Sequence, residues 1–350
     1  MTSPPSGAGG GPPARGAVPA GTPARGVVAN GTAPEPAPRP RPFLKWAGGK
    51  GQLLRELLDR TPAEMGAYFE PMVGGGALFF ALAGSNERRL DRAVLNDANA
   101  ELMAAYRIVR DRVDPLIRCL EVHAREYLEQ DDEGRDRYYY DVRAAEPSDV
   151  VERAARMLFL NRTCYNGLYR VNRAGRFNVP HGRYARPRIL AADALRSASR
   201  ALAQVDLRSL DVADAVADAQ AGDFVYIDPP FFPLSPTSSF TDYTTGRFGE
   251  AEQLQLRWLI DDLTERGVLV MLSNSDADWV RAAYVTARYG VADRTGGPDR
   301  GAAPERAHHV IDFVPARRMI NSRGDRRSAI RELIVINPPL AEALGGVGPG

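Results

Sequence analysis

Short apolar runs alternate with longer segments of helical periodicity along most of this chain. The runs "AYFEP" (67–71) and "RAVLND" (92–97) predict buried strands, and each precedes a segment that predicts a helix, "GGGALFFALAG" and then "ANAELMAAYRIVR". Strands and helices in alternation are typical of a parallel, doubly wound sheet. We therefore expect an α/β fold with a mostly parallel sheet.

The same alternation returns after residue 206. "DFVYIDPP" and "VLVMLSNS" (268–275) predict two more buried strands, "EAEQLQLRWLIDDLTERG" (250–267) predicts an amphipathic helix between them, and "RELIVIN" (331–337) predicts a last strand. The middle of the chain is predicted to be helical. We therefore expect a core made of residues 43–112 and 206–340, interrupted by a helical insert, residues 113–205.

The two ends of the chain are expected to lie outside this core. Residues 1–42 contain eleven prolines and eight glycines, no aromatic residue, and four arginines against one acid. Such a segment cannot bury enough apolar surface to offset the entropy lost on ordering, so it is expected to be disordered. Its arginines leave contact with an anionic partner open. Residues 341–350 are expected to form a flexible tail.

Composition excludes several classes of protein. The charges nearly balance, with 45 basic and 44 acidic residues, so net charge indicates no particular partner. Two cysteines, and four histidines without zinc-ligand spacing, indicate neither a disulfide framework nor a metal site. There is no apolar run of membrane-spanning length and no recognisable signal peptide, so we expect a soluble protein of the cytoplasm.

One stretch of the insert is strongly basic. The 36 residues from Arg153 to Arg188 contain nine arginines, five interleaved aromatic residues, and no aspartate or glutamate. Guanidinium groups contact phosphates and base edges, and aromatic rings stack on bases, so this stretch is the candidate for binding nucleic acid. A solvated, arginine-rich helix is the alternative, but it does not account for the missing acids.

Three consecutive glycines, Gly74 to Gly76, separate the strand at 67–71 from the helix that follows it. Glycine permits a sharp turn and the close approach of a ligand, although the spacing is that of neither a dinucleotide nor a Walker motif. Asp97 ends the next strand, where an acid can accept both hydroxyls of a ribose. A nucleoside cofactor without a pyrophosphate therefore fits. The alternative is that Asp97 caps a helix beginning at Ala98.

The segment "FVYIDPPFF" (224–232) is an apolar strand that ends in an acid and two prolines. Proline cannot donate to a sheet, so the strand stops and delivers Asp228 to the rim, and Pro229 and Pro230 fix the backbone there. The Asp228 carboxylate and the Pro229 carbonyl can both accept from one exocyclic amine, while Phe231 offers a face on which a base stacks. A simple turn at the strand end is the alternative.

With these segments in view, the chain resembles the Dam-type site-specific DNA (adenine-N6) methyltransferases. The resemblance covers about residues 42–338 and is carried, in order, by "PFLKWAGGKGQLL" (42–54), "FEPMVGGGALF" (69–79), "LNDANAEL" (95–102), "NRTCYNGLYRVNRAGRFNVPHGRY" (161–184) and "DPPF" (228–231). It implies an S-adenosylmethionine-dependent methyltransferase fold with an inserted helical DNA-recognition domain. The family more often has tyrosine where Phe231 stands, and Phe-Val-Gly after the Glu-Pro pair, from which Met72 departs.

The resemblance also implies roles for individual residues. S-adenosylmethionine is expected as methyl donor, without a metal, and Asp211 is expected near its adenine, with Asp214 competing for that place. The other residues expected to flank the donor are Trp46, Lys50, Glu70, Pro71, Gly74, Gly76, Asp97 and Asp228. The catalytic segment is expected to be Asp228, Pro229, Pro230 and Phe231.

Double-stranded DNA is the partner that the resemblance implies. A target adenine must leave the duplex to reach such a site. Arg170 is expected to form a bidentate bond to guanine, and GATC is the leading recognition sequence. The residues expected to contact DNA are Lys45, Tyr165, Asn166, Leu168, Arg170, Pro180 and Tyr184. A cognate restriction endonuclease is a further candidate partner, and no membrane is implied.

Two other functions stay open at this level. An RNA base is a possible substrate, because stacking is indifferent to the sugar. A catalytically inactive DNA-binding relative would be expected to lose Asp228 or the glycine loop, and both are present.

Overall fold

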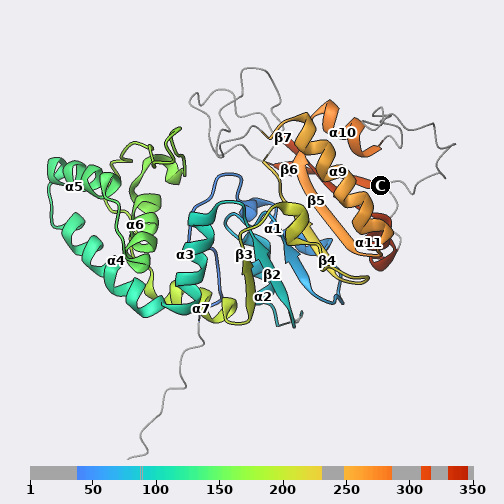
Figure 1. The fold of residues 1–350 in the computed structure, drawn as a ribbon, viewed down its shortest axis with the longest axis horizontal. Coiled ribbons are helices and arrows are strands. Elements are labelled where there is room, and N and C mark those ends of the chain that lie inside the picture. The colour runs from blue at the N-terminus through green and yellow to red at the C-terminus, as the bar shows by residue number, and fades with distance from the viewer. Residues whose placement is uncertain are drawn as a thin grey trace, which may run out of the picture. The chain divides into compact units, whose positions relative to one another are not determined.

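The computed structural model places seven strands of the described residues side by side in one sheet, with helices on both faces (Figure 1). The structure describes residues 38–86, 88, 90–230, 248–285, 309–316 and 330–345. The strands are β1 (Tyr68–Glu70), β2 (Ala93–Asn96), β3 (Val205–Arg208), β4 (Phe224–Ile227), β5 (Leu269–Ser275), β6 (Val310–Ala316) and β7 (Ile330–Ile336).

The sheet is doubly wound and mostly parallel, which confirms the expected fold class. Its order is β3-β2-β1-β4-β5-β7-β6, and only β7 runs antiparallel, against both β5 and β6. β1 pairs in parallel with β2 on one side and with β4 on the other. The order of the strands therefore reverses at β1, where successive strands begin to be added on the other side. In doubly wound sheets, ligands bind in the crevice beyond the carboxyl ends of the strands at such a reversal point.

Side chains along the strands alternate between two apolar layers. On β4, Phe224 and Tyr226 pack with the layer that contains helices α1 (Leu54–Asp59), α2 (Ala77–Ala83), α3 (Ala100–Asp111) and α11 (Pro338–Ala343). Val225 and Ile227 pack with the opposite layer, under α9 (Glu250–Glu265) and α10 (Asp278–Val285). Because both faces are covered, the central strands consist of continuous apolar residues, as the sequence predicted.

The two edge strands were missed by the sequence analysis. β3 is "VDLR", whose Asp206 is exposed, and β6 is "VIDFVPA", which contains an acid and a proline. Edge strands tolerate charges and proline because one side of each strand forms no ladder, so they lack the apolar run that marks a central strand.

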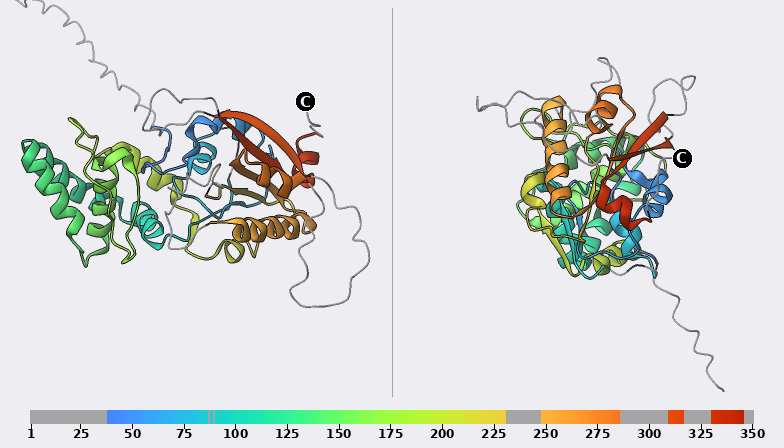
Figure 2. Two further views of the ribbon diagram at one scale, coloured as in Figure 1. Left: turned by 90° about the horizontal axis from the view of Figure 1, so that it is seen from above. Right: turned by 90° about the vertical axis from the view of Figure 1, so that its right-hand side faces the viewer.

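The insert lies on the side of α3 that faces away from the sheet (Figures 1 and 2). Its helices are α4 (Val113–Leu128), α5 (Asp132–Ala144) and α6 (Val150–Thr163), and α7 (Ala192–Leu202) leads back to the sheet at β3. The domain division at residues 113 and 205 stays a prediction, although α4 begins at Val113 and β3 at Val205.

The arginine-rich stretch is not one helix. α6 ends at Thr163, and the chain then forms the short 3₁₀ turn Tyr165–Gly167 and an irregular hairpin in which Val171 pairs with Phe177 and Cys164 with His181. Glycines and prolines such as Gly175 and Pro180 stop the helical pattern. The alternative of a solvated arginine-rich helix is therefore wrong beyond Thr163, and we call residues 164–184 the recognition hairpin.

Some predictions fall outside the described residues. These are most of the predicted tail 1–42, part of the tail 341–350, and Phe231. In the described parts of the chain, no helix combines the length and the apolar character that crossing a bilayer requires.

Candidate active site

Asp228 directly follows β4, at the carboxyl end of the sheet. Pro229 is buried and Pro230 exposed, so the strand cannot continue beyond the acid. One carboxylate oxygen, Oδ1, accepts a hydrogen bond from Ser273 Oγ on β5 at 2.8 Å and lies 2.8 Å from Lys50 Nζ. The side chain is 20% exposed. Asp228 is thus a fixed, ion-paired carboxylate at the rim, and not a simple turn residue.

Lys50 is buried and forms the positive centre of the site. Its ammonium group donates to the Gly48 carbonyl at 3.0 Å, pairs with Asp228, and lies 3.8 Å from Glu332 Oε2 on β7. A buried ammonium group requires such partners because desolvation of an unpaired charge is costly. Burial raises the pKa of Glu332, and the ammonium of Lys50 partly offsets that rise. The sequence analysis identified neither Ser273 as a partner of Asp228 nor Glu332 as a partner of Lys50, because only the pairing of strands in the sheet brings these residues together.

Glu70 ends β1, next to β4, and is buried. Tyr68 donates a hydrogen bond to its carboxyl oxygen at 2.7 Å. Burial raises the pKa of Glu70 to about 8, and the charge of Asp228 adds to the rise. Glu70 therefore keeps its proton at neutral pH, while the neighbouring Asp228 forms an ion pair with Lys50.

The glycine loop follows β1 and approaches Trp46 closely. Gly74 and Gly76 have φ of 47° and 67°, which side chains rarely adopt. A Cβ at Gly74 would lie 2.7 Å from Cδ1 of Trp46, and one at Gly76 would lie 2.9 Å from the hydroxyl of Tyr106. Both glycines are thus required here by conformation and by space.

Asp97 connects the glycine loop to the end of β2. Its two carboxylate oxygens accept from the backbone N–H of Gly74 at 3.1 Å and of Asn99 at 2.9 Å. The N-cap of α3 is Asn99, whose side chain accepts from Leu102 N at 3.0 Å. The alternative that Asp97 caps the helix is therefore wrong: the helix begins two residues later than that interpretation requires, and Asn99 has the short side chain that reaches N3.

Asn96 fixes the next loop along the same rim. Its side chain donates to the carbonyls of Pro71 and Leu210 at 2.9 and 3.1 Å and accepts from the Leu210 N–H at 2.8 Å. Asp211 follows directly, exposed, at the start of α8 (Val212–Ala215), which also contains the competing Asp214. The carboxyl ends of β1, β2 and β3 thus present Glu70, Asp97 and Asp211 along one edge.

This edge fits a nucleoside cofactor. The backbone at Gly74 has no side chain, Asp97 retains further lone pairs on both oxygens, and the loop before α8 lies at the neighbouring strand end. Among the described residues, no group of three or more histidine, cysteine or acidic side chains lies close enough to hold a metal ion.

Residues predicted to contact DNA come together around the recognition hairpin. The Tyr165 N–H donates to the Pro180 carbonyl at 2.9 Å, and the Asn166 N–H donates to the Tyr184 hydroxyl at 2.8 Å. Lys45 Nζ lies 5.5 Å from the centre of the Tyr184 ring. Five of the seven predicted residues, from three separate segments, therefore form one cluster, and Tyr165 at its surface is 53% exposed.

Arg170 and Leu168 lie in the same hairpin. Arg170 is exposed, and its guanidinium donates to the Asn178 side chain at 2.7 Å, which holds it against the opposite strand of the hairpin. Leu168 is half-buried. Gly167 has φ of 65°, and a Cβ there would lie 2.5 Å from Cδ of Lys45, so the lysine crosses directly over this glycine.

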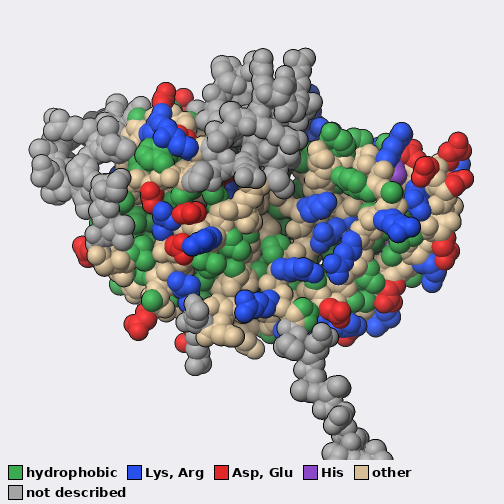
Figure 3. Space-filling model, turned by 180° about the vertical axis from the view of Figure 1, so that it is seen from behind, with side chains coloured by type: hydrophobic (Ala, Val, Ile, Leu, Met, Phe, Trp, Pro, Cys, Tyr) green, Lys and Arg blue, Asp and Glu red, His purple; other side chains and the backbone are tan. Residues whose placement is uncertain are grey.

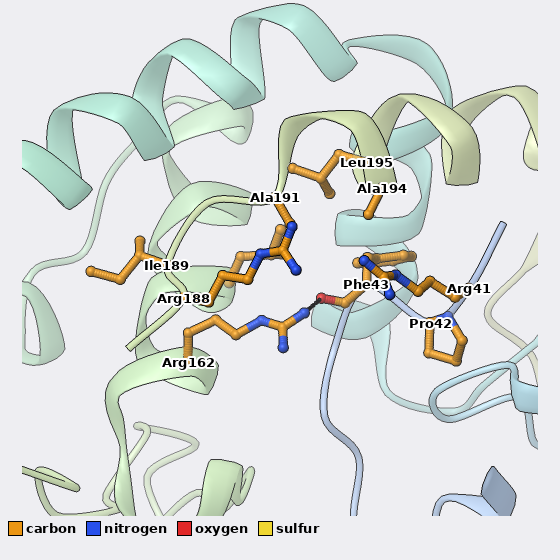
Figure 4. A pocket seen from close by; sticks show the side chains of 10 residues that line it. Arg41, Pro42, Phe43, Arg162, Arg188, Ile189, Ala191, Ala194 and Leu195 are labelled. Carbon is orange, nitrogen blue, oxygen red and sulfur yellow. Dashed lines mark hydrogen bonds between the residues drawn. The ribbon is translucent and has the colours of Figure 1, made fainter. Parts of the chain in front are cut away.

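Three arginines line a cavity of about 260 Å³ (Figure 4). Arg41 precedes the first motif, Arg162 lies in the last turn of α6, and Arg188 follows the hairpin. Arg162 donates to the Phe43 carbonyl at 2.6 Å, and burial, with the charges of Arg188 and Arg41, lowers its pKa. None of the ion pairs found among the described residues involves these three arginines. The sequence showed the basic run but not this convergence.

Basic side chains also gather on a larger scale. Seen from behind, several Lys and Arg side chains lie together just right of the middle of the face, and most acidic side chains in view lie left of the middle or toward the edges (Figure 3). Such a distribution favours a polyanionic ligand.

A doubly wound sheet with a glycine loop after β1, an acid after β2 and Asp-Pro-Pro after β4, joined to a basic insert, defines a DNA methyltransferase that acts on an amine. Residues 46–295, more than half of the chain, match the family described as D12 class N6 adenine-specific DNA methyltransferase. The chain belongs to this family and is an adenine-specific DNA methyltransferase.

Several similar proteins match this chain over most of its length. The type II methyltransferase M.MjaIII of Methanocaldococcus jannaschii is 39% identical over 85% of this chain and 99% of its own length. The type II methyltransferase M1.LlaDCHI of Lactococcus lactis subsp. cremoris is 42% identical over 70% of this chain and 84% of its own. The DNA adenine methylase of Escherichia coli is 33% identical over 85% and 96%.

Proposed function

We propose that this methyltransferase takes its methyl group from S-adenosylmethionine and transfers it to the N6 amine of an adenine rotated out of duplex DNA. The observation that supports this most is the position of Asp228. It lies at the carboxyl end of β4, next to Glu70 and the glycine loop at the end of β1, with its carboxylate fixed by Lys50 and Ser273.

The residues along the strand ends would hold the cofactor, which supplies an electrophilic methyl group when bound. Asp97 would accept from its ribose, and Asp211 would contact its adenine. Trp46 would flank it across the glycine loop. The remaining residues proposed for this pocket are Lys50, Glu70, Pro71, Gly74 and Gly76.

The catalytic segment would bind the target amine. Both bonds to the Asp228 carboxylate described above go to Oδ1, so we assign the amine's N–H to Oδ2 and its second N–H to the Pro229 carbonyl. Two acceptors favour a tetrahedral nitrogen whose lone pair is available for transfer. Pro230 would fix the backbone, and Phe231 would stack on the base.

The insert would supply the energy that opens the base pair, about a few kcal/mol. Arg162 and Arg188 of the insert, together with Arg41 from outside it, would contact phosphates, because three positive charges around one cavity suit an anion. Tyr165 and Asn166 would enter the duplex near the flipped base, and Arg170 would read a guanine through its O6 and N7. The other residues proposed to contact DNA are Lys45, Leu168, Pro180 and Tyr184.

We propose GATC as the recognition sequence, from the resemblance of the hairpin motif to family members that read it. Two of the similar proteins are named type II methyltransferases, which supports a cognate restriction endonuclease as partner. A gene for a nuclease that cleaves the same sequence, and is blocked by the methylated base, would test that partnership.

Plasmid methylation tests the reaction and the target together. The purified protein and S-adenosylmethionine should place N6-methyladenine in GATC, read by methylation-aware sequencing. The variant Asp228→Ala should lose at least about 10³-fold in rate while binding S-adenosylhomocysteine normally. Full activity of that variant would refute the catalytic assignment, and a mark in a different sequence would refute GATC while leaving the chemistry intact.

A further inference from the structure

Trp46 lies between the glycine loop and the recognition hairpin. One edge of its indole is against Gly74, where a Cβ would lie 2.7 Å from Cδ1. Its face stacks on Tyr169 of the hairpin, with ring centroids 5.3 Å apart and planes 25° apart. The same side chain thus touches the proposed cofactor pocket and the residue directly before Arg170.

Tyr169 is fixed from three sides and is itself buried. Its ring packs edge-on against Phe177, on the other strand of the hairpin, at 5.8 Å. Its hydroxyl donates to Glu101 on α3, the helix that starts just after Asp97 and Asn99. Trp46, Tyr169 and Phe177 therefore form a continuous row of rings, which we call the aromatic row, from the glycine loop into the hairpin.

A second connection runs parallel to the aromatic row. The side chain of Asn161, which is 3% exposed, accepts from the Lys45 N–H at 2.8 Å and donates to the carbonyls of Lys45 and Gly167 at 2.7 and 3.1 Å. The backbone next to Trp46 is thus tied to the backbone two residues before Tyr169. A displacement of Trp46 cannot leave the hairpin unchanged, since packed interiors do not deform continuously.

We propose that Tyr169 is a positioning residue that couples the cofactor pocket to sequence recognition. A nucleoside cofactor seated against Gly74 and Trp46 fixes the indole, the indole fixes the Tyr169 ring, and the hairpin then holds Arg170 in the orientation that reads DNA. By thermodynamic reciprocity, specific DNA strengthens cofactor binding by the same factor. This inference rests on the proposed roles of Trp46 and Arg170.

The experiment measures DNA affinity with and without S-adenosylhomocysteine, a ligand that does not react. The probe is a fluorescent duplex with one copy of the motif that the wild-type protein methylates on plasmid DNA. For the wild type, saturating S-adenosylhomocysteine should tighten binding by about fivefold or more, a typical size for coupled sites. Tyr169→Leu keeps an apolar side chain without the flat ring, and should bring this ratio to about one.

Two variants control for general damage to the insert. Tyr169→Phe retains the stack and should retain the ratio. Tyr138→Leu removes a matched tyrosine of the same insert, which packs on Phe159 at 5.6 Å and donates to Glu126 at 3.0 Å, and it should also retain the ratio. If Tyr169→Leu does not fold, Tyr169→Met takes its place, because a thioether fills the space flexibly.

Hydrogen exchange supplies a second readout. S-adenosylhomocysteine should slow amide exchange across residues 167–178 in the wild type and in Tyr138→Leu, but not in Tyr169→Leu. A Tyr169→Leu protein with the wild-type ratio, or a wild type with no coupling, would overturn the inference. Both results concern binding alone. Plasmid methylation by the wild-type protein is measured separately, so failure of this inference can be distinguished from failure of the proposed reaction.

Discussion

Glu70→Gln should remove a loss in the free energy of unfolding that grows as pH rises. Glutamine has the same shape and can still accept from the Tyr68 hydroxyl, which donates to Glu70 at 2.7 Å. It cannot ionise. The comparison of the two proteins therefore isolates the titration of one buried carboxyl group.

The magnitude follows from the pKa of Glu70, which burial raises from 4.5 to about 8. Below pH 4.5 both folded and unfolded states hold the proton, and the group has no pH-dependent effect. Above it the unfolded chain ionises while the folded protein keeps its proton, so the free energy of unfolding falls by about 1.4 kcal/mol per pH unit. The loss ends near pH 8. Between about pH 5 and pH 8 this amounts to about 4 kcal/mol.

Urea unfolding of both proteins at several pH values in this window measures the effect. Other groups that titrate, including Glu332, are common to the two proteins and cancel in the difference. The variant should gain stability over the wild type steadily as pH rises. A constant difference between the two proteins at all pH values would refute the reasoning, because it would mean that Glu70 ionises alike in the folded and unfolded states.

Three further substitutions test the site and the hairpin. Ser273→Ala removes the 2.8 Å bond to Asp228, and should lower kcat by about tenfold without changing the KM for the cofactor; an unchanged kcat would contradict the role of this serine. Asp97→Asn places an amide beside the Gly74 and Asn99 N–H groups, and should weaken S-adenosylhomocysteine binding by about tenfold or more in calorimetry; equal binding would remove Asp97 from the pocket. Gly167→Ala should lower stability by about 1–2 kcal/mol for its left-handed backbone alone, with more from contact with Lys45; an unchanged melting temperature would argue against this conformation.

The central strands and the rim residues could be predicted because local sequence determines them. β4 is apolar on both faces and ends at two prolines, so the position of Asp228 follows from "FVYIDPP" without knowledge of any neighbour. The glycine loop and Asp97 follow in the same way from strand ends. These positions depend on backbone chemistry within a few residues.

The partners of these residues could not be predicted, because they depend on pairing across the sheet. Ser273 reaches Asp228 since β5 lies beside β4, and Glu332 reaches Lys50 since β7 runs antiparallel to β5. The sequence could not decide whether Asp97 caps the next helix, for a related reason: Asn99, two positions later, is the N-cap. Both are good capping residues, and only the bond from Gly74 N–H, 23 positions away, engages Asp97 elsewhere.

The route of the chain around the insert has a consequence for how such enzymes diversify. The chain leaves the sheet region after α3 and re-enters it through α7, and α3 and α7 pack against each other. Exit and return are therefore adjacent, so a foreign segment of different length can be accommodated without moving a strand. The insert can therefore be exchanged, or can change in sequence, while the strands that position the proposed catalytic residues keep their places. If the insert reads the DNA sequence, as we propose, chimeras joined at α3 and α7 should methylate adenine in the recognition sequence of the protein that supplied the insert.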